Sequence, residues 1–475
     1  MKRYFIYNIF IITILFFSSC EKFLDVHPKS SISEKDLLTS EVGFSQALNG
    51  IYSQMASREL YGDNLSMGFV SALAQNYTAT AHGFVFKETT ALNYESSEVK
   101  NFTEQIWQTS YKAIAGINNI LENIDSQESN FTANNFKLTK GESLGLRAYL
   151  HFELFRLFAP TYASGASKLS IPYRKEMNSY SQKPSTVEGF INQLINDLDV
   201  AEKLLENVDP IMQGDKDRRF NMNYLAVKAL HARVLIYKGD KDKAYQKAKS
   251  VVDANVFSFV TNAQISAVAA TKDRLFTNEQ VFALRVSKMI NWVESGTSSY
   301  FRYNTSMSSY VLTRTDANFA TLYETTAGGA TDYRFVYLLE NDGPTRFVSK
   351  FWQTWSITGY TEKDRLDQTI PLIRFSELHY IMAESSSDLT EGIKALNTVR
   401  KNRGLADLAA TITPTTLTSE IAKEYQKEFY AEGQLFYFYK RLNYQRMQFN
   451  TVALTEKSYV LPVPDSETEF NNQYN

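Results

Sequence analysis

Residues 146–159 limit most strongly what this chain can fold into. Their sequence, LRAYLHFELFRLFA, places large apolar residues on more than half of the circumference of a helix. Such a helix cannot keep one broad face in water, because most of its sides would expose hydrocarbon. The segment therefore predicts a helix packed on two sides, inside a protein with several layers of helices. Pro160 ends it.

A second unit, residues 223–252, has the pattern of a helical hairpin. Small or branched apolar residues recur four positions apart, at Ala226, Leu230, Val234, Ala244, Ala248 and Val252. Gly239 and Asp240 interrupt the pattern and predict a turn. Small residues at these positions let two helices approach closely. The unit resembles a tetratricopeptide hairpin.

Other segments repeat this design, and the stretches between them do not. Related helix pairs are expected around residues 107–124 and 186–205, and a late pair at roughly 373–385 and 389–403, the latter closed by Gly404 in the left-handed conformation. Residues 61–99, 262–367 and 404–418 are rich in Ser, Thr, Gly, Asn and aromatics, which is typical of loops and short strands. Residues 350–355 look like a strand leading into the helix at 373.

The predicted fold class is thus mainly α. A tetratricopeptide-like scaffold of helical hairpins occupies about residues 40–260 and 370–445. An irregular, loop-rich insertion that carries short strands occupies about residues 262–367. No clean linker separates independent domains, and the segment 20–475 is expected to be one binding domain.

The first 19 residues have the order of a lipoprotein signal peptide. Lys2 and Arg3 precede an apolar run, residues 9–17, that is too short to span a bilayer. The run ends in Ser18-Ser19-Cys20, which resembles a lipobox, although phenylalanine stands where leucine is usual. Cys20 is the only cysteine, so it cannot form an intramolecular disulfide. We expect Cys20 to be acylated and to anchor the chain to lipid.

The charge balance excludes one class of partner. Lysine and arginine number 50 against 52 acidic residues, so the chain lacks the positive surplus that attracts a nucleic-acid backbone. No nucleic acid is expected. Aromatic residues make up 14% of the chain, and such a share either fills helix interfaces or lines a binding surface.

Landmarks along almost the whole chain resemble the RagB/SusD family of outer-membrane nutrient-binding lipoproteins. They are Cys20 to Asp25 with Pro28, Gly43-Phe44 to Tyr52, Trp107 with Tyr111, Ile114 and Asn118, Gly141 to Phe158, Ala226 to Tyr237, Leu372 to Glu384, Ala395 to Arg400, Glu428 to Gly433, Lys440-Arg441 and Leu461 to Pro464. Each is weak alone, but their order is specific. Ser376 stands where the family has alanine, which indicates a divergent branch.

The resemblance implies a function as well as a fold. Proteins of this family sit at the cell surface as a lid over a SusC-like TonB-dependent transporter, capture an oligosaccharide and pass it to the channel. In some branches the ligand is a peptide or another nutrient, and that alternative stays open. No bond is broken in this cycle, so neither an enzyme activity nor a cofactor is expected.

Catalytic and metal motifs are weak. Residues 141–145 match the Gly-x-Ser-x-Gly nucleophile elbow, but no strand precedes them, and Ser143 is interpreted as a residue at a helix start. The five histidines are scattered without the short spacings of metal sites. A pair of glycosidase carboxylates cannot be judged from sequence, because their separation is a property of the folded chain.

The candidate ligand contacts are aromatic residues in the irregular stretches. A sugar ring stacks its C–H groups on an aromatic face, while its hydroxyls need polar partners. The family resemblance places such contacts in residues 61–94 and 292–310, where the candidates are Trp292, Tyr300, Tyr303, Tyr61, Tyr77 and Tyr94. Packing against the scaffold remains the other possible role of Trp292. Trp107 is expected to pack between helices, whereas Trp352 and Trp355 have no preferred role.

Overall fold

The computed structural model describes most of the chain after the first 36 residues. The described residues are 37–78, 84–178, 180–269, 271–294, 299–303, 310–353 and 367–470. Cys20, the predicted signal peptide and Trp355 lie outside them. Within these ranges, no helix is long and apolar enough to cross a membrane.

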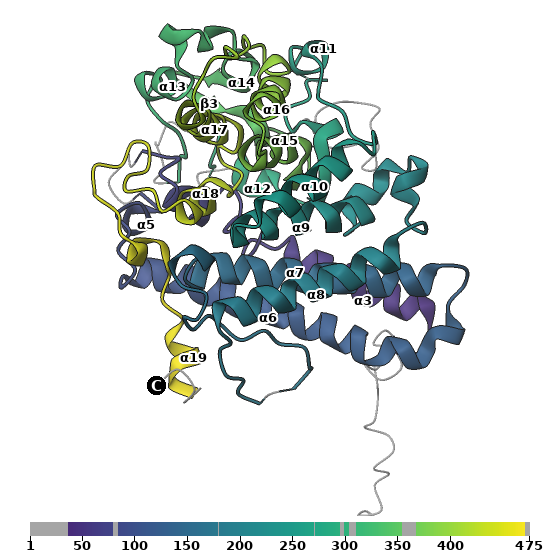
Figure 1. The fold of residues 1–475 in the computed structure, drawn as a ribbon. Coiled ribbons are helices and arrows are strands. Elements are labelled where there is room, and N and C mark those ends of the chain that lie inside the picture. Colours follow the sequence, from purple (N-terminus) through teal and green to yellow (C-terminus); the bar gives the residue numbers. More distant parts are fainter. Residues whose placement is uncertain are drawn as a thin grey trace, which may run out of the picture.

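Successive long helices pack against one another to form the scaffold. They are α3 (Glu41–Met55), α6 (Ser97–Ile124), α7 (Asn135–Phe158), α8 (Val187–Leu205), α9 (Tyr224–Lys238), α10 (Lys241–Val252), α15 (Phe375–Ser385), α16 (Leu389–Lys401) and α17 (Pro414–Glu428). Figure 1 shows α3, α6, α7 and α8 in one layer, α9 and α10 above it, and α15 to α17 beyond them. The mainly helical fold class is confirmed.

Helix α7 is the centre of this arrangement, as its sequence predicted. All residues from Gly141 to Phe158 are buried, and the helix packs on both α6 and α8. Gly141 lies against Leu205 of α8, and Gly145 lies against Met222 just before α9. A Cβ atom at either glycine would come within 3.0 Å of those side chains, so glycine is what permits the close approach.

The α9–α10 hairpin forms where the sequence placed it. Asn223 caps α9 by accepting a hydrogen bond from the Ala226 amide, which satisfies one of the free donors at the helix start. Gly239 ends the helix at φ +90°, and Asp240 caps α10. The buried face of α10 carries Ala244, Ala248 and Val251, which confirms the prediction of a closely packed pair.

The insertion contains short helices and strands. The helices are α11 (Asn262–Ile265), α12 (Ile290–Val293), α13 (Asp316–Leu322) and α14 (Tyr333–Leu338). Strands β2 (Leu339–Asp342) and β3 (Thr345–Val348) form a hairpin, and β1 (Gln280–Arg285) pairs antiparallel with β4 (Thr369–Arg374). Since β4 leads directly into α15, this pairing joins the insertion to the second half of the scaffold.

Two local predictions in this region are wrong. The described part of the supposed strand at 350–355 is a turn of 3₁₀ helix, Ser349–Phe351, in which Phe351 packs against Phe301. The helix predicted from Ile373 begins at Phe375, because Ile373 pairs with Phe282 in the β1–β4 ladder. Both errors arise from contacts with residues far away in sequence.

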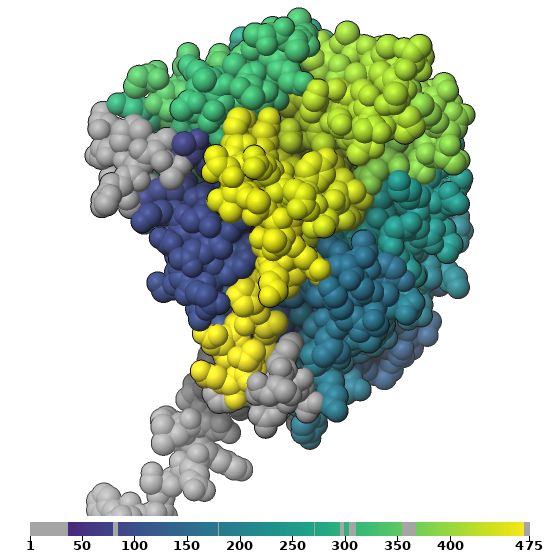
Figure 2. Space-filling model, turned by 60° about the vertical axis from the view of Figure 1, so that its left-hand side comes forward, coloured from purple at the N-terminus to yellow at the C-terminus, as the bar shows by residue number. Residues whose placement is uncertain are grey.

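Short helices also occur in the stretches that were predicted to be loops, and near the C-terminus. They are α4 (Phe69–Leu73), α5 (Lys87–Thr90), α18 (Leu435–Arg441) and α19 (Asp465–Phe470). Figure 2 shows the C-terminal residues (yellow) running over the surface between the dark-blue residues around the start of α6 and the α7–α8 region. Tyr94 donates a hydrogen bond to the Ser458 carbonyl, and Lys100 pairs with Asp465, which fixes this last segment to the first helices.

A buried ionic cluster, which we call the Glu428 cluster, connects the insertion with the scaffold. The Glu428 carboxylate, 0% exposed, accepts hydrogen bonds from Arg334 of α14, Arg374 of β4 and Arg403 after α16. Glu279, Glu424, Glu432, Asp332 and Lys350 complete it. Burial alone would raise the pKa of Glu428, but the three guanidinium groups hold it well below its usual range.

Candidate ligand-binding site

A pocket of about 620 Å³ lies at the C-terminal half of α3, and we call it the α3 pocket. Its other walls are the end of a 3₁₀ helix, Lys216–Phe220, the last residues of β1 and helix α12. Its aromatic lining is Tyr52, Phe220 and Trp292, and its polar lining includes Asn49, Ser53, Arg58, Asn221, Arg285 and Ser287. This volume lies in the range typical of small-molecule sites.

Arg58 organises one wall of the pocket. Its guanidinium lies 5.3 Å from the centre of the Trp292 ring, and its Nη2 lies 2.5 Å from Asp63 Oδ2. The Tyr300 hydroxyl donates to the same Asp63 oxygen at 2.9 Å. Trp292 Nε1 donates to the Gly62 carbonyl at 3.2 Å. The indole ring is therefore held at the pocket by a guanidinium on its face and a hydrogen bond at its edge.

The charges in this wall are nearly compensated. Burial raises the pKa of Asp63, and the adjacent Arg58 opposes that shift. Burial also raises the pKa of Tyr300 well above its ordinary value, and the Asp63 carboxylate adds to the effect. Tyr300 thus remains a neutral hydrogen-bond donor at any physiological pH.

Glu142, a buried carboxylate of α7, holds a second wall of the pocket in place through hydrogen bonds to the lining residues Tyr52 and Asn221. Its Oε1 accepts hydrogen bonds from the Tyr52 hydroxyl at 2.5 Å and from Asn221 Nδ2 at 2.9 Å. Its Oε2 lies 3.3 Å from Arg218. The Tyr52 oxygen in turn accepts from the Met222 amide at 2.8 Å. Tyr52 and Asn221 therefore reach the pocket from fixed positions, and a preformed wall reduces the ordering cost of binding a ligand.

The third wall places a cation on an aromatic ring. The Arg285 guanidinium lies 4.0 Å from the centre of the Phe220 ring, at the exposed end of β1. Among the described residues, its side chain makes no hydrogen bond or ion pair. The pocket therefore combines aromatic surfaces with amide, hydroxyl and guanidinium groups, which is the mixture that a sugar requires.

Two of the predicted contacts meet in this site. Trp292 is 9% exposed and lines the pocket, and Tyr300, which is 3% exposed, lies behind it. Tyr303 is half-buried and lies elsewhere, with its ring against Gly343 in the β2–β3 turn and its amide donating to Asp342 at 2.8 Å. Direct contact of these residues with a ligand stays a prediction.

The other three candidates do not line the α3 pocket. Tyr61 is 1% exposed and packs on the Tyr149 ring, and Tyr77 is 2% exposed with its hydroxyl bonded to the Met67 carbonyl. In this structure neither ring presents a face to solvent. Tyr94 is half-buried against the C-terminal segment.

Trp107 and Trp352, the two described tryptophans outside the pocket, serve packing. Trp107 is 3% exposed and lies edge-on to Phe158, which confirms its predicted role between helices. Trp352 is 7% exposed, and its Nε1 donates to the Phe301 carbonyl at 2.7 Å, so its ring points inward.

Asn49, Arg58, Phe220, Asn221 and Arg285 were missed by the sequence reasoning. They come from separate segments, so no spacing along the chain relates them. The sequence offered only local indications that these residues could contact a ligand. Arg58 lies close to Tyr61 in a stretch already marked for ligand contact, and Phe220 follows a run of charged residues just before α9.

Ser143 and His151, two of the residues considered for catalysis or metal binding, make structural contacts. Ser143 lies inside α7 rather than at a helix start, which corrects that detail, and its hydroxyl donates to the Thr139 carbonyl. No strand–turn–helix elbow surrounds it. His151 stacks on Tyr173, with both ring nitrogens hydrogen-bonded to backbone atoms. Among the described residues, no group of three or more His, Cys, Asp or Glu side chains is arranged to hold a metal ion.

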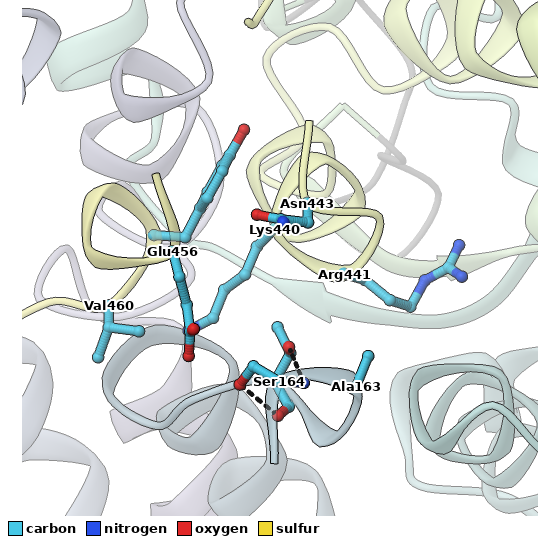
Figure 3. Close-up of a pocket in the computed structure, with 9 residues that line it drawn as sticks. Ala163, Ser164, Lys440, Arg441, Asn443, Glu456 and Val460 are labelled. Atoms are coloured by element: carbon cyan, nitrogen blue, oxygen red, sulfur yellow. Dashed lines mark hydrogen bonds between the residues drawn. The ribbon is translucent and has the colours of Figure 1, made fainter. Parts of the chain in front are cut away.

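Two other cavities are less suited to a sugar. A groove of about 660 Å³ lies between α8, α9 and α10, and none of the described residues that line it is Phe, Tyr or Trp. Its charged side chains pair with one another, as Lys247 does with Glu202. A smaller cavity of about 180 Å³ surrounds Lys440 (Figure 3). There Lys440 donates to the carbonyls of Arg156 and Ala159 at 2.7 Å, so it satisfies the end of α7 rather than facing a ligand.

Comparisons with known proteins agree with this architecture. The family model described as "Starch-binding associating with outer membrane" matches residues 22–236, and the SusD family model matches residues 344–475. Together they span more than two thirds of the chain. No curated protein shows significant sequence similarity to it.

Solved structures show the same fold. A SusD superfamily protein from Bacteroides thetaiotaomicron has a TM-score of 0.71 at 22% identity, over 91% of this chain and 98% of that one. A SusD-like carbohydrate binding protein from Bacteroides vulgatus has a TM-score of 0.71 at 18% identity, over 91% and 97%. A SusD homolog from B. thetaiotaomicron has a TM-score of 0.68 at 15% identity, over 94% and 98%.

These matches and the helical scaffold lead to one assignment. The family consists of binding proteins and not of enzymes, which agrees with the structural roles of Ser143 and His151. The chain belongs to the SusD/RagB family.

Proposed function

We propose that this protein captures an oligosaccharide at the surface of the outer membrane and delivers it to a SusC-like TonB-dependent transporter. The family match carries this proposal, since one matching family model is described as starch-binding and associated with the outer membrane. The α3 pocket supports it, because aromatic faces and fixed polar groups converge there.

The pocket suits a sugar for a physical reason. The exposed hydroxyls of a pyranose lose hydrogen bonds to water on binding, and unpaired polar groups cost about 1–3 kcal/mol each. Asn49, Ser53, Asn221 and Ser287 supply replacement partners. Trp292 and Phe220 supply the aromatic surface for the C–H face of the ring.

Ligand class is tested by calorimetry on the purified chain without its first 20 residues. Oligosaccharides from a glycan array and a set of short peptides are titrated into the same protein. Saturable binding of at least one oligosaccharide, in the absence of peptide binding, is the expected result. Binding of peptides alone would contradict the proposal of a glycan ligand and support a peptide ligand instead. The proposed role as a lid would be unchanged.

The partner is tested in native membranes. Gentle detergent extraction followed by affinity purification of this protein is expected to recover a large TonB-dependent outer-membrane protein. Contact through the exposed loops is expected, because the balanced charge gives little electrostatic steering. Recovery of the chain alone, even after cross-linking, would contradict the delivery role.

A further inference from the structure

The charged side chains that line the α3 pocket are cationic. Among the described residues, its lining contains two guanidinium groups, Arg58 and Arg285, and no Asp or Glu side chain. A pocket built only for neutral sugar hydroxyls needs acceptors as well as donors, and carboxylates are the strongest acceptors. In this lining the charged groups are all donors.

The acids behind the pocket wall pair with Arg58 and Arg218 and leave Arg285 without a carboxylate partner among the described residues. Asp63 already accepts hydrogen bonds from Arg58 Nε and Nη2 and from the Tyr300 hydroxyl. Glu142 and Asp209 share Arg218, at 3.3 Å and 3.1 Å. Arg285 therefore remains an uncompensated charge among the described residues.

The two guanidinium groups remain available to a ligand. Arg285 is exposed, its guanidinium lies 4.0 Å from the centre of the Phe220 ring, and no carboxylate of the described residues pairs with it. The Arg58 side chain is 51% exposed, and its Nη1 makes no hydrogen bond to a described residue. A planar guanidinium fixed against an aromatic ring loses little freedom when it binds, and its paired N–H groups match the two oxygens of an oxyanion.

From this geometry we propose that the α3 pocket selects an acidic sugar, one that bears a carboxylate or a sulfate ester, with Arg285 as the residue that determines the specificity. The inference rests on the proposed capture of a glycan and narrows its ligand class. Phe220 and Trp292 contact the ring carbons, while Arg285 and Arg58 Nη1 donate to the anionic group.

The test begins with a glycan array containing neutral, uronate-containing and sulfated oligosaccharides. The tightest binders are expected to carry a carboxylate or a sulfate. Comparison of the uronate-containing set with the sulfated set shows which of these two groups the pocket prefers. The best binder is then titrated by calorimetry into the parent protein, Arg285→Gln and Arg446→Gln. Arg446 is exposed and does not line the pocket, so it is a matched control for the loss of one positive charge.

We expect Arg285→Gln to raise the Kd roughly ten- to a hundred-fold, the range of a lost charge-assisted hydrogen bond, with an unchanged melting temperature. Arg446→Gln is expected to bind as the parent does. If neutral oligosaccharides bind as well as acidic ones, or if Arg285→Gln leaves the Kd unchanged, acidic selectivity is wrong while glycan capture stands. If no oligosaccharide binds, both proposals fall.

Discussion

Trp292 serves both the pocket and the protein interior. The Trp292 side chain lines the α3 pocket, while its Nε1 donates to the Gly62 carbonyl and its ring centre lies 5.3 Å from the Arg58 guanidinium. The two roles that the sequence left open are therefore compatible. A truncation at this position has to be followed by both binding and melting measurements.

Trp292→Ala is expected to weaken ligand binding by about 2 kcal/mol, or roughly thirty-fold, which is the scale of an interface hot spot. It is also expected to lower the melting temperature, since the bond to Gly62 is lost. Trp107→Ala is the control, with a stability loss of about 3 to 5 kcal/mol and unchanged affinity. Parental affinity in a folded Trp292→Ala protein would place the stacking surface elsewhere.

Two buried histidines predict an acid-sensitive stability. Burial lowers the pKa of His151 from 6.5 to about 3 and that of His379 from 6.5 to about 4. The unfolded chain therefore binds these two protons at a higher pH than the folded chain does. Their contribution to stability is fully present above pH 6.5 and decreases as the pH falls from 6.5 towards 4.

His379→Phe tests this directly. Neither ring nitrogen of His379 has a hydrogen-bond partner in the described structure, and the ring packs among Phe259 and Phe375, so phenylalanine suits the site. The free energy of unfolding is measured with denaturant at several pH values between 7 and 4. Its slope against pH should be shallower in the variant than in the parent by up to about 1.4 kcal/mol per pH unit, the value for one proton. An unchanged slope would show that His379 is not a source of the acid sensitivity.

At the scale of secondary structure, elements held by local contacts were predictable and those held by distant contacts were not. The hairpin of α9 and α10 depends on Asn223, Gly239 and Asp240, which act within their own turns. The β1–β4 sheet pairs Gln280 with Arg374, and nothing near either residue indicates the other. The same limit applies to the α3 pocket, where Trp292 was a candidate and Arg285 was not.

The Glu428 cluster joins elements that are far apart in sequence, so its removal should affect the whole fold. Glu428→Gln leaves Arg334, Arg374 and Arg403 buried without their shared carboxylate. Breaking a buried ion pair costs about 3–5 kcal/mol. We expect a loss of this size in denaturant unfolding.

The matched control for this prediction is Glu391→Gln. Glu391 pairs with Lys394 on the exposed face of α16, where such a pair is worth about 0–1 kcal/mol. Equal effects of the two substitutions would mean that the buried cluster contributes no more than a surface pair does.

At the scale of the whole molecule, attachment to the membrane depends on the proposed acylation of Cys20. Cys20→Ala is expected to leave the protein out of the membrane fraction, either uncleaved or in soluble form, because the only thiol is lost. Detergent partitioning of cells that express each form measures this. Unchanged partitioning of the variant into the detergent phase would contradict the lipoprotein proposal.

The general architecture could be predicted from the sequence because its main helices show their packing faces in their own residues. Residues 141–158 of α7 and the hairpin of α9 and α10 carry their packing faces in their own sequence, and they define the scaffold. The site is assembled where α3, β1 and α12 meet. Its composition follows from the three-dimensional arrangement, and no single segment contains it.

The position of the bound ligand is the most direct test of the proposal that the α3 pocket is the glycan-binding site. A crystal structure of the chain with its tightest-binding oligosaccharide should place a sugar ring in the α3 pocket, within contact of Trp292 or Phe220, and an acidic group within hydrogen-bonding distance of Arg285. An oligosaccharide bound elsewhere, for example in the groove between α8 and α10, with the α3 pocket empty, would contradict it.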